Sequence, residues 1–463
     1  MLFSANVPSI RQTSVWFPSQ KEVFIMFISD TIRYVGVNDR QLDLFEGQFP
    51  VPNGITYNSY IILDQQIAVM DAVDIRFTSE WLSNIKAVLG SRSPDYLVIQ
   101  HMEPDHSGSI LRFTEAYPAA RIIASDRAFV MLKNFFNTDF ADRRIVVNDR
   151  DTLSLGSRTL TFITASMVHW PEVIMTYDTR DQVLFSADAF GKFGTFDMED
   201  PWIDEARRYY FGIVGKYGSP VQNVLKKLAH LNIRKICPLH GPVLSENTDF
   251  YMNLYNIWSR YQAEEDGIVI AYTSVYGNTK NAVEYLAAQL RNKCRIPVTV
   301  HDLARGGMFA AVTDAFRYSK LVLATTTYNG SAFPFMLEFI EHLKERNFSH
   351  RTVAFIENGS WAPAAAHTMK KLLACSNDLR LINPSVTILS TLNEQSSAQL
   401  TTLADELSRK IPAENPCGEI APTPAAGKTS VCSICGYVHE GQLPADFVCP
   451  FCKRGADVFT ESI

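Results

Sequence analysis

Seven side chains of the kinds that bind metal ions are spread over residues 101–240. They are four imidazoles and three carboxylates: His101, Glu103, Asp105, His106, His169, Asp188 and His240. A tetrahedral zinc site takes only three or four protein ligands, whereas this set suits two metal ions that share one ligand. Any one of these residues taken alone could be an ordinary surface or core residue. The complete set predicts a dinuclear metal centre.

The first four candidates lie in the hexapeptide HMEPDH, which follows an apolar segment. Residues 94–100 predict a buried strand, and the internal proline and the Ser-Gly-Ser that follows predict that the hexapeptide is a loop. Alternate residues of an extended loop point the same way, so His101, Glu103 and Asp105 can converge while His106 turns towards a second ion. Two other candidates also follow strand-like segments: residues 159–165 precede His169, and residues 183–185 precede Asp188.

The second half of the chain carries three loops that could hold a phosphorylated, flat cofactor. Residues 268–272 predict a central parallel strand, and a hydroxyl-rich turn and a helix with an apolar face follow it. Such a turn presents N–H groups to a phosphate, and it matches neither GxGxxG nor GxxxxGK[ST]. Strands at residues 321–324 and 352–356 lead into the other two loops. Because ligands bind beyond the carboxyl ends of parallel strands, the three loops should form one site.

The candidate cofactor contacts combine hydroxyl groups, amides, glycine backbone and aromatic rings. They are Ser274, Tyr276, Gly277, Asn278 and Thr279 in the first loop, Thr327, Tyr328, Asn329 and Gly330 in the second, and Asn358, Gly359, Ser360 and Trp361 in the third. Tyr328 and Trp361 could flank a flat ring, although a purely structural role stays open for each ring taken alone. A plain capped helix would explain the first loop alone equally well.

The C-terminal segment contains two CxxC pairs. Cys432 and Cys435 form the first pair, Cys449 and Cys452 the second, and thirteen residues separate Cys435 from Cys449. Four thiolates at this spacing predict a tetrahedral metal site, and both iron and zinc accept four cysteines. A structural zinc ribbon is therefore the alternative to an iron site. The other cysteines are isolated, as is typical of a reducing cytoplasm.

Composition is typical of a multidomain protein. A chain of 463 residues with 46% hydrophobic and 20% charged residues is long enough for two large domains and a small one. A formal net charge of −6 without a basic stripe argues against nucleic acid as a partner. No apolar run reaches the ~18 residues that a membrane span needs. We expect these parts: residues 26–264 with the metal centre, 267–411 with the cofactor loops, a Pro-, Ala- and Gly-rich linker at 412–430, and the cysteine domain at 431–463.

Residues 1–25 have no periodic or capped element and no apolar core of signal-peptide length. The tripeptide Lys21-Glu22-Val23 can be encoded by a bacterial ribosome-binding sequence placed shortly before the codon for Met26. We therefore expect residues 1–25 to be a non-native extension, with translation starting at Met26.

Together, these motifs resemble the flavodiiron proteins. The metal-type residues resemble the metallo-β-lactamase superfamily, whose hydrolases carry His-x-His-x-Asp-His, but Glu103 replaces the second His and favours iron over zinc. The loops resemble the flavodoxin module, with Thr326 where a Pro is usual, and the cysteine pairs resemble the short-spaced rubredoxin of rubrerythrins. The resemblance covers residues 26–463. It implies an α/β multidomain fold, with a metallo-β-lactamase-like αββα sandwich, a flavodoxin-like doubly wound parallel sheet and a small rubredoxin-like knuckle domain.

The resemblance also implies a cofactor for each part: two non-haem irons, one FMN and one iron on the four cysteines. His101, Glu103 and His169 would hold one iron of the pair and Asp105, His106 and His240 the other, with Asp188 bridging. The implied activity is reduction of O2 to water, of NO to N2O, or both. Electrons would come from a separate NAD(P)H-dependent reductase or another donor and pass from the four-cysteine iron to FMN and then to the diiron centre. A cytoplasmic head-to-tail homodimer, or a dimer of dimers, is implied as well.

Two other functions compete with this interpretation. One is a dizinc hydrolase with accessory redox domains, which metal analysis would reveal as zinc without iron. The other is a non-catalytic electron carrier or gas sensor, which steady-state gas consumption would distinguish from an enzyme. Sequence alone does not discriminate between O2 and NO, because both need the same ligands.

Overall fold

The computed structural model describes residues 26–198, 201–374, 376–409, 429–432, 438–449 and 453–462. The predicted non-native extension at residues 1–25 lies outside the described residues, as do Cys435, Cys452 and residues 412–428 of the predicted linker. In the part of the chain that is described, no helix is both long and apolar enough to cross a membrane.

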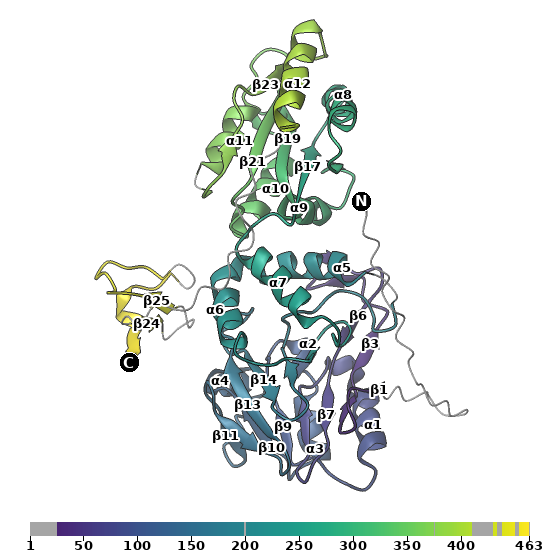
Figure 1. The fold of residues 1–463 in the computed structure, drawn as a ribbon, viewed down its shortest axis with the longest axis vertical. Coiled ribbons are helices and arrows are strands. Elements are labelled where there is room, and N and C mark those ends of the chain that lie inside the picture. Colours follow the sequence, from purple (N-terminus) through teal and green to yellow (C-terminus); the bar gives the residue numbers. More distant parts are fainter. Residues whose placement is uncertain are drawn as a thin grey trace, which may run out of the picture.

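The first domain is a sandwich of two sheets (Figure 1). The larger sheet has the order β1 (Met26–Phe27), β2 (Ile32–Tyr34), β7 (Tyr60–Ile62), β8 (Ala68–Met70), β9 (Tyr96–Val98), β10 (Arg121–Ala124) and β11 (Arg144–Val146). The smaller sheet has the order β12 (Thr152–Ser154), β13 (Thr159–Thr164), β14 (Ile174–Asp178), β15 (Val183–Phe185) and β16 (Lys235–Cys237). Two short pairs complete the strands: β3 (Val37–Asp39) with β6 (Ile55–Tyr57), and β4 (Leu44–Phe45) with β5 (Phe49–Pro50).

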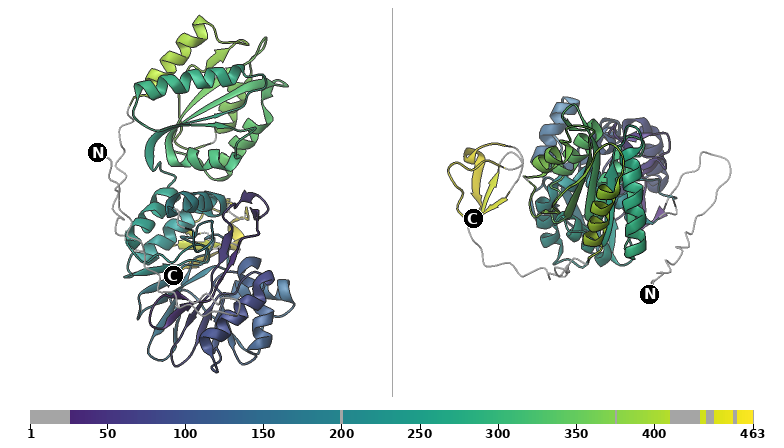
Figure 2. Two further views of the ribbon diagram at one scale, coloured as in Figure 1. Left: turned by 90° about the vertical axis from the view of Figure 1, so that its right-hand side faces the viewer. Right: turned by 90° about the horizontal axis from the view of Figure 1, so that it is seen from above.

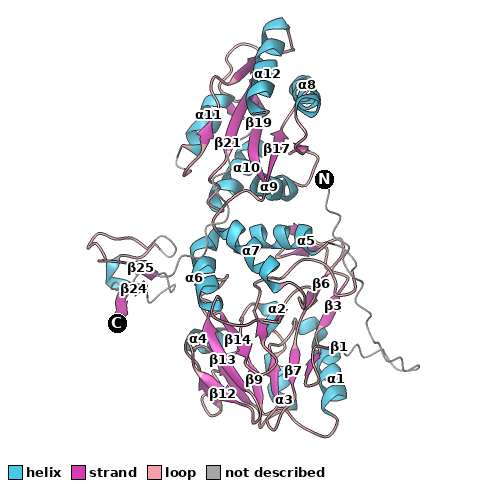
Figure 3. Ribbon diagram, in the orientation of Figure 1, coloured by secondary structure: helices cyan, strands magenta, loops and turns pink. Residues whose placement is uncertain are grey.

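Side chains from both sheets meet in a buried core between them. Met70 and Val98 of the larger sheet and Phe162 and Phe185 of the smaller sheet belong to one such cluster. The other faces of the sheets pack against helices (Figure 3). These are α1 (Thr78–Leu89), α2 (Pro104–Ser107), α3 (Ile110–Ala116), α4 (Asp126–Phe136), α5 (Trp202–Tyr209), α6 (Gly218–Leu228) and α7 (Thr248–Ser259), with a π-helical turn at Tyr210–Val214 and 3-10 turns at Ile75–Phe77 and Gly215–Tyr217.

The second domain is a parallel sheet with helices on both faces. The sheet order is β18 (Val298–Asp302), β17 (Glu265–Tyr272), β19 (Tyr318–Tyr328), β21 (Thr352–Asn358) and β22 (Arg380–Leu381), with β23 (Val386–Ile388) beside β21 and β20 (Ser331–Ala332) beside β19. Alternate residues of β17 face opposite sides: Ile268 and Ile270 pack with α8 (Asn278–Lys293) and α12 (Glu394–Leu407). Val269 and Ala271 belong to the core on the side of α9 (Met308–Arg317), α10 (Pro334–Glu345) and α11 (Ala365–Leu373). Burial on both faces explains why residues 268–272 of β17 form a continuous apolar run.

The two large domains share a continuous hydrophobic core. The rings of Phe211 and Phe316 stack with centroids 4.3 Å apart, and those of Phe49 and Phe309 meet at 4.6 Å. Arg346 of the second domain donates from Nε to the Phe211 carbonyl at 2.6 Å. Apolar burial and a hydrogen-bonded cation both hold the domains in one relative orientation.

The C-terminal domain is a small three-stranded sheet in the order β25 (Val438–Glu440), β24 (Thr429–Cys432) and β26 (Phe459–Ser462). A 3-10 turn at Ala456–Val458 directly precedes β26. The Phe447 ring packs between His439 and Phe459, at centroid distances of 4.6 and 5.3 Å. Cys432 and Cys449 lie buried in one cluster. In Figures 1 and 2 this domain lies beside the first domain rather than the second.

Candidate metal centre and cofactor sites

The structure brings the seven predicted metal-type side chains together in two groups. One group contains His101, Glu103, His169 and Asp188, and the other contains Asp105, His106 and His240. The donor atoms within each group all lie within 4.8 Å of one another. Residues more than a hundred positions apart thus meet at one end of the two sheets, as a dinuclear site requires.

The hexapeptide HMEPDH is not the fully extended loop that its sequence predicted. Helix α2 begins at Pro104, with Glu103 as its N-cap residue. Proline is favoured at the first helical position because its fixed φ suits the helix and its missing N–H needs no partner there. The helical turn puts Asp105 into the second group with His106, so the expected convergence of Asp105 with His101 and Glu103 was wrong.

Asp188 lies between the two groups. Its Oδ2 is 3.1 Å from Nε2 of His169, and its Oδ1 is 3.3 Å from Nε2 of His106. Asp188 follows the fully buried strand β15, so the fold fixes the position of its carboxylate. One oxygen facing each group is the arrangement that a bridging ligand needs.

Three buried residues outside the predicted set form hydrogen bonds with these histidines and with the chain just after β9. Oε1 of Glu172 lies 2.8 Å from Nδ1 of His101, and Nδ1 of His240 lies 2.6 Å from the Thr56 carbonyl oxygen. Such partners keep the proton on Nδ1 and leave Nε2 for a metal ion. Asp71 accepts N–H bonds from Gln100 and His101. Glu172 was not among the predicted site residues, although its position three residues after His169 in MVHWPE was an available signal.

Burial and neighbouring charges shift the pKa values of the side chains in the site. Burial raises the pKa of the Asp105 carboxyl to about 7, and burial together with His106 lowers the pKa of the His240 imidazole to about 4. Burial alone would lower the pKa of the His169 imidazole, but hydrogen bonds with Asp188 and Glu103 outweigh burial and raise this pKa to about 9. Both oxygens of Asp105 and Oδ1 of Asp188 are buried without a hydrogen-bond partner. Buried carboxylate oxygens without partners are costly unless a cation is bound, so the donor set fits two metal ions.

Aromatic rings surround the imidazoles of the site. The centroids of Phe45, Tyr57 and Tyr209 lie 5.3, 6.2 and 5.4 Å from that of His240. Trp170 packs edge-on against His101 at 5.3 Å. The Tyr209 hydroxyl is buried and has no hydrogen-bond partner. These rings form an aromatic wall around the metal-type residues.

The three predicted cofactor loops lie at one edge of the second domain. Strands β17, β19 and β21 are parallel neighbours, with Tyr272 opposite Ala324 and Ala324 opposite Ile356. Strand β19 continues to Tyr328 and β21 to Asn358, so Thr327, Tyr328 and Asn358 are strand residues and not loop residues as expected. Asn278 and Thr279, also expected in a loop, are instead the first two residues of α8. The remaining candidates follow the strand ends, with Asn329 and Gly330 in the turn between β19 and β20.

Several predicted contacts support the loops themselves. Oγ of Ser274 accepts the Gly277 N–H at 3.1 Å, and Oγ1 of Thr279 lies 3.1 Å from that of Thr326. Thr326 of β19, the residue that differs from the expected Pro, thus ties the first turn of α8 to this strand. The Thr327 hydroxyl accepts the Ala364 N–H. The Asn358 amide donates to the Ser390 carbonyl and accepts the Ser390 N–H. The Ser360 hydroxyl accepts a hydrogen bond from the Ser390 hydroxyl. Asn278 begins α8 directly after Gly277, and Gly359 lies in the same loop as Ser360.

The aromatic candidates project from these loops. The Tyr276 and Trp361 side chains are 93% and 91% exposed, and that of Tyr328 is 46% exposed. Such exposure is unusual for tryptophan, and it leaves flat apolar surface for a ring system to cover. A phosphate at the start of α8 and a flat ring between these side chains would use the same edge of the sheet.

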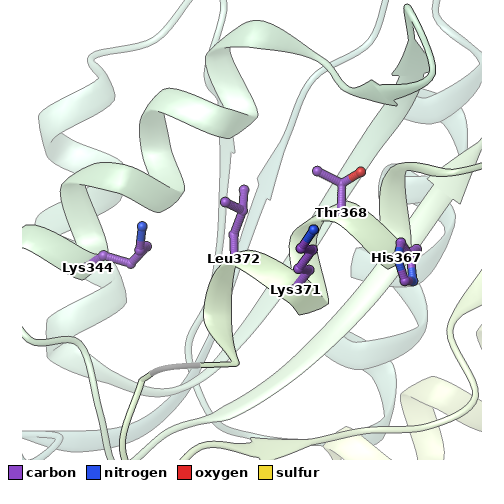
Figure 4. A pocket seen from close by; sticks show the side chains of 5 residues that line it. All are labelled: Lys344, His367, Thr368, Lys371 and Leu372. Carbon is purple, nitrogen blue, oxygen red and sulfur yellow. The ribbon is translucent and has the colours of Figure 1, made fainter.

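A separate hollow of about 470 Å³ lies between α10 and α11 (Figure 4). It is lined by Lys344, His367, Thr368, Lys371 and Leu372. Among the residues that the structure describes, no predicted site residue borders this hollow, which is separate from the metal-type residues and from the loops at the strand ends.

Three family models match consecutive parts of the chain. The model "ODP family beta lactamase" matches residues 55–241, "Flavodoxin domain" matches 269–382, and "Rubrerythrin, rubredoxin-like domain" matches 431–460. The matches contain, in turn, the seven metal-type residues, the three loops and both CxxC pairs. The fold class predicted from sequence is therefore confirmed.

Relatives and solved structures agree with these models. The anaerobic nitric oxide reductase flavorubredoxin of Aliivibrio fischeri is 25% identical, over 94% of this chain and 99% of its own. That of Salmonella arizonae is 25% identical over 94% of this chain and 98% of its own. The rubredoxin oxygen:oxidoreductase of Desulfovibrio gigas superposes with a TM-score of 0.77 at 24% identity, over 83% of this chain and 98% of that one. The flavodiiron protein of Giardia intestinalis superposes with a TM-score of 0.76 at 22% identity, over 84% and 97%. The chain belongs to the flavodiiron proteins, as a member with a C-terminal rubredoxin-like domain.

Proposed function

We propose that this protein removes dioxygen, nitric oxide or both by reducing O2 to water and NO to N2O at a diiron centre. The observation that carries the proposal is the convergence of four imidazoles and three carboxylates in two groups joined by Asp188. The flavodoxin-like and rubredoxin-like domains of the same chain supply the two electron-carrying parts that such a reduction needs. The protein is accordingly an oxidoreductase that uses iron and FMN.

The proposed ligands follow the two groups. His101, Glu103 and His169 would hold one iron, Asp105, His106 and His240 the other, and Asp188 would bridge them. Carboxylate oxygens and imidazole nitrogens without any thiolate are donors that iron accepts readily. When bound, the iron pair supplies a place where a diatomic gas is polarised and reduced. Cys432, Cys435, Cys449 and Cys452 are the proposed ligands of the third iron, and the exposed loop residues are the proposed FMN contacts.

The side chains around the metal-type residues have definite tasks in this proposal. Glu172 and Thr56 orient two imidazoles through their Nδ1 atoms. Glu103 adds negative charge, and hydrogen bonds from His101 and His169 overcome burial to lower the pKa of its carboxyl. The Phe45 and Tyr209 rings exclude water, which strengthens electrostatic interactions inside the site. The chain thus supplies a charged, oriented and largely dry binding site.

The names of the relatives support both NO and O2 as substrates. The flavorubredoxins aligned over nearly the whole chain are named anaerobic nitric oxide reductases, and a structural neighbour is named an oxygen:oxidoreductase. The proposed order of carriers is the four-cysteine iron, then FMN, then the iron pair. We propose a separate NAD(P)H-dependent reductase or another external donor as the electron source. A cytoplasmic location and a head-to-tail dimer, or a dimer of dimers, belong to the same proposal.

Gas consumption by the purified protein tests this function. With chemically reduced FMN, the iron-loaded protein should consume O2 and NO in separate electrode assays. Asp188→Asn should abolish consumption because it removes the negative charge shared by both groups. Asp405→Asn, a matched change of a side chain that is 59% exposed on α12 of the second domain, should leave consumption unchanged. Zinc without iron, together with no gas consumption, would favour the hydrolase; bound iron and FMN with no turnover would favour the carrier or sensor.

A further inference from the structure

An apolar contact joins the C-terminal domain to the metal-binding domain. Cys432 and Cys449, each the first cysteine of its pair, form a buried cluster, and Val458 and Phe459 of the same domain pack against it. The fifth member of this contact is Met167, which belongs to the loop between β13 and β14. The cysteine end of the small domain therefore faces that loop.

The loop presents different residues on its two sides. His169 is buried and reaches the metal-type group, while Met167, two residues earlier, is only partly buried and contacts the cysteine cluster. Met167 has a φ of +64°, and its N–H donates to the Trp170 carbonyl at 2.8 Å, so the chain turns sharply at this point. One short turn thus connects the cysteine site with a candidate iron ligand.

The contact is specific to one of the two large domains. In the described part of the chain, the cluster includes no residue of the flavodoxin-like domain at 267–409. Both views agree, because the C-terminal domain lies level with the metal-binding domain in Figure 1 and in the left panel of Figure 2.

We propose that the loop around Met167 is the docking surface for the rubredoxin-like domain of the same chain. The docked domain presents its cysteine site to the side of the loop opposite His169, and not to the flavodoxin-like domain of its own chain. Electrons that leave the docked domain therefore start beside the metal centre. They reach a flavin only if the domain undocks or if a second copy brings its own flavin to this end.

The chemistry of the contact fits reversible docking. Redox partners associate through small interfaces, below ~1,200 Å², so that they can separate between transfers. Methionine is flexible and polarisable and adapts to a partner surface without a rigid fit. A contact in which one methionine meets two cysteines, a valine and a phenylalanine has these properties.

A photo-crosslinking side chain at position 167 tests the proposal in the full chain with iron and FMN bound. With benzoylphenylalanine in place of Met167, irradiation should join residue 167 to peptides from residues 438–462 without doubling the mass of the chain. The control position is Phe27, exposed on β1 at the opposite side of the domain in Figure 1. Equal crosslinking from both positions, none from position 167, or products of doubled mass alone would overturn docking within one chain.

Hydrogen exchange gives a second, independent readout. Met167→Lys places a charge in the apolar contact, so the amides of residues 456–462 should exchange several-fold faster, while the absorbance of the four-cysteine iron shows that the small domain stays folded. Val130→Lys, on the exposed side of α4, is the matched control and should change nothing there. Unchanged exchange at residues 456–462 in Met167→Lys would refute the proposal, whatever gas the protein reduces.

Discussion

Replacing Glu172 by glutamine should weaken the metal ion held by His101 and leave the fold intact. The Glu172 carboxylate is fully buried, and its Oε1 lies 2.8 Å from both Nδ1 of His101 and the Met102 nitrogen. Glutamine keeps an oxygen for both donors but removes the negative charge. The His101 imidazole becomes a weaker base at Nε2, because its Nδ1 proton is no longer shared with an anion.

The size of the effect follows from the single bond that changes. Loss of such an outer partner typically lowers metal affinity by about 10- to 100-fold. That range corresponds to about 1.4–2.7 kcal/mol in binding free energy. Oε2 of Glu172 already lacks a hydrogen-bond partner, so an amide nitrogen at that position breaks no existing hydrogen bond. Glu172→Ala should lower affinity further, because it removes both hydrogen bonds and leaves a cavity.

A chelator titration measures this effect. The iron-loaded full chain is dialysed against increasing chelator, and iron per FMN is determined at each step. Glu172→Gln should lose iron at about 10- to 100-fold lower chelator than the parent, and the four-cysteine absorbance should not change. Glu115→Gln removes the same charge from an exposed position on α3 and should match the parent. A titration curve of Glu172→Gln identical to that of the parent would show that Glu172 does not tune His101.

Three further predictions test other parts of the molecule. Burial raises the pKa of Asp71 to about 6, so the protonated carboxyl stabilises the folded state, and this stabilisation is lost as pH rises from about 4 to 6. In the metal-free protein, urea unfolding should show this loss of stability for the parent but not for Asp71→Asn. An equal pH dependence of the two proteins would contradict the prediction. Trp361→Ala should raise the Kd for FMN about tenfold through lost ring contact, measured by flavin fluorescence, with Tyr285→Ala unchanged; unaltered affinity would remove Trp361 from the site. Cys432→Ser should remove one iron and the four-cysteine absorbance while FMN stays bound, and full retention of that iron would exclude Cys432 as a ligand.

The residues that carry the chemistry could be predicted because their types are rare in these positions. Four histidines and three carboxylates after apolar strands have few structural uses, and two CxxC pairs have fewer. The strands themselves were also predictable: Val183–Phe185 is β15 without change, and the apolar run at residues 268–272 lies inside β17. Periodicity and burial on both faces of a sheet determine these segments locally.

Features that depend on tertiary contacts were not predictable in the same way. Asp105 lies in the second group because Pro104 begins helix α2. In the sequence alone, a proline at this position indicates the end of a strand equally well. Glu172 acquires its role only when the β13–β14 loop brings it to His101. The contact of Met167 with the cysteine cluster joins segments far apart in the chain, and no local pattern records it.

The most direct test of the central claim is a crystal structure of the iron-loaded full chain with anomalous scattering measured at the iron edge. We predict two iron peaks, one at each group of metal-type side chains, with the Asp188 carboxylate between them, and a third at the four cysteines. A single peak among the seven residues, or peaks that follow the zinc edge instead, would contradict the diiron assignment.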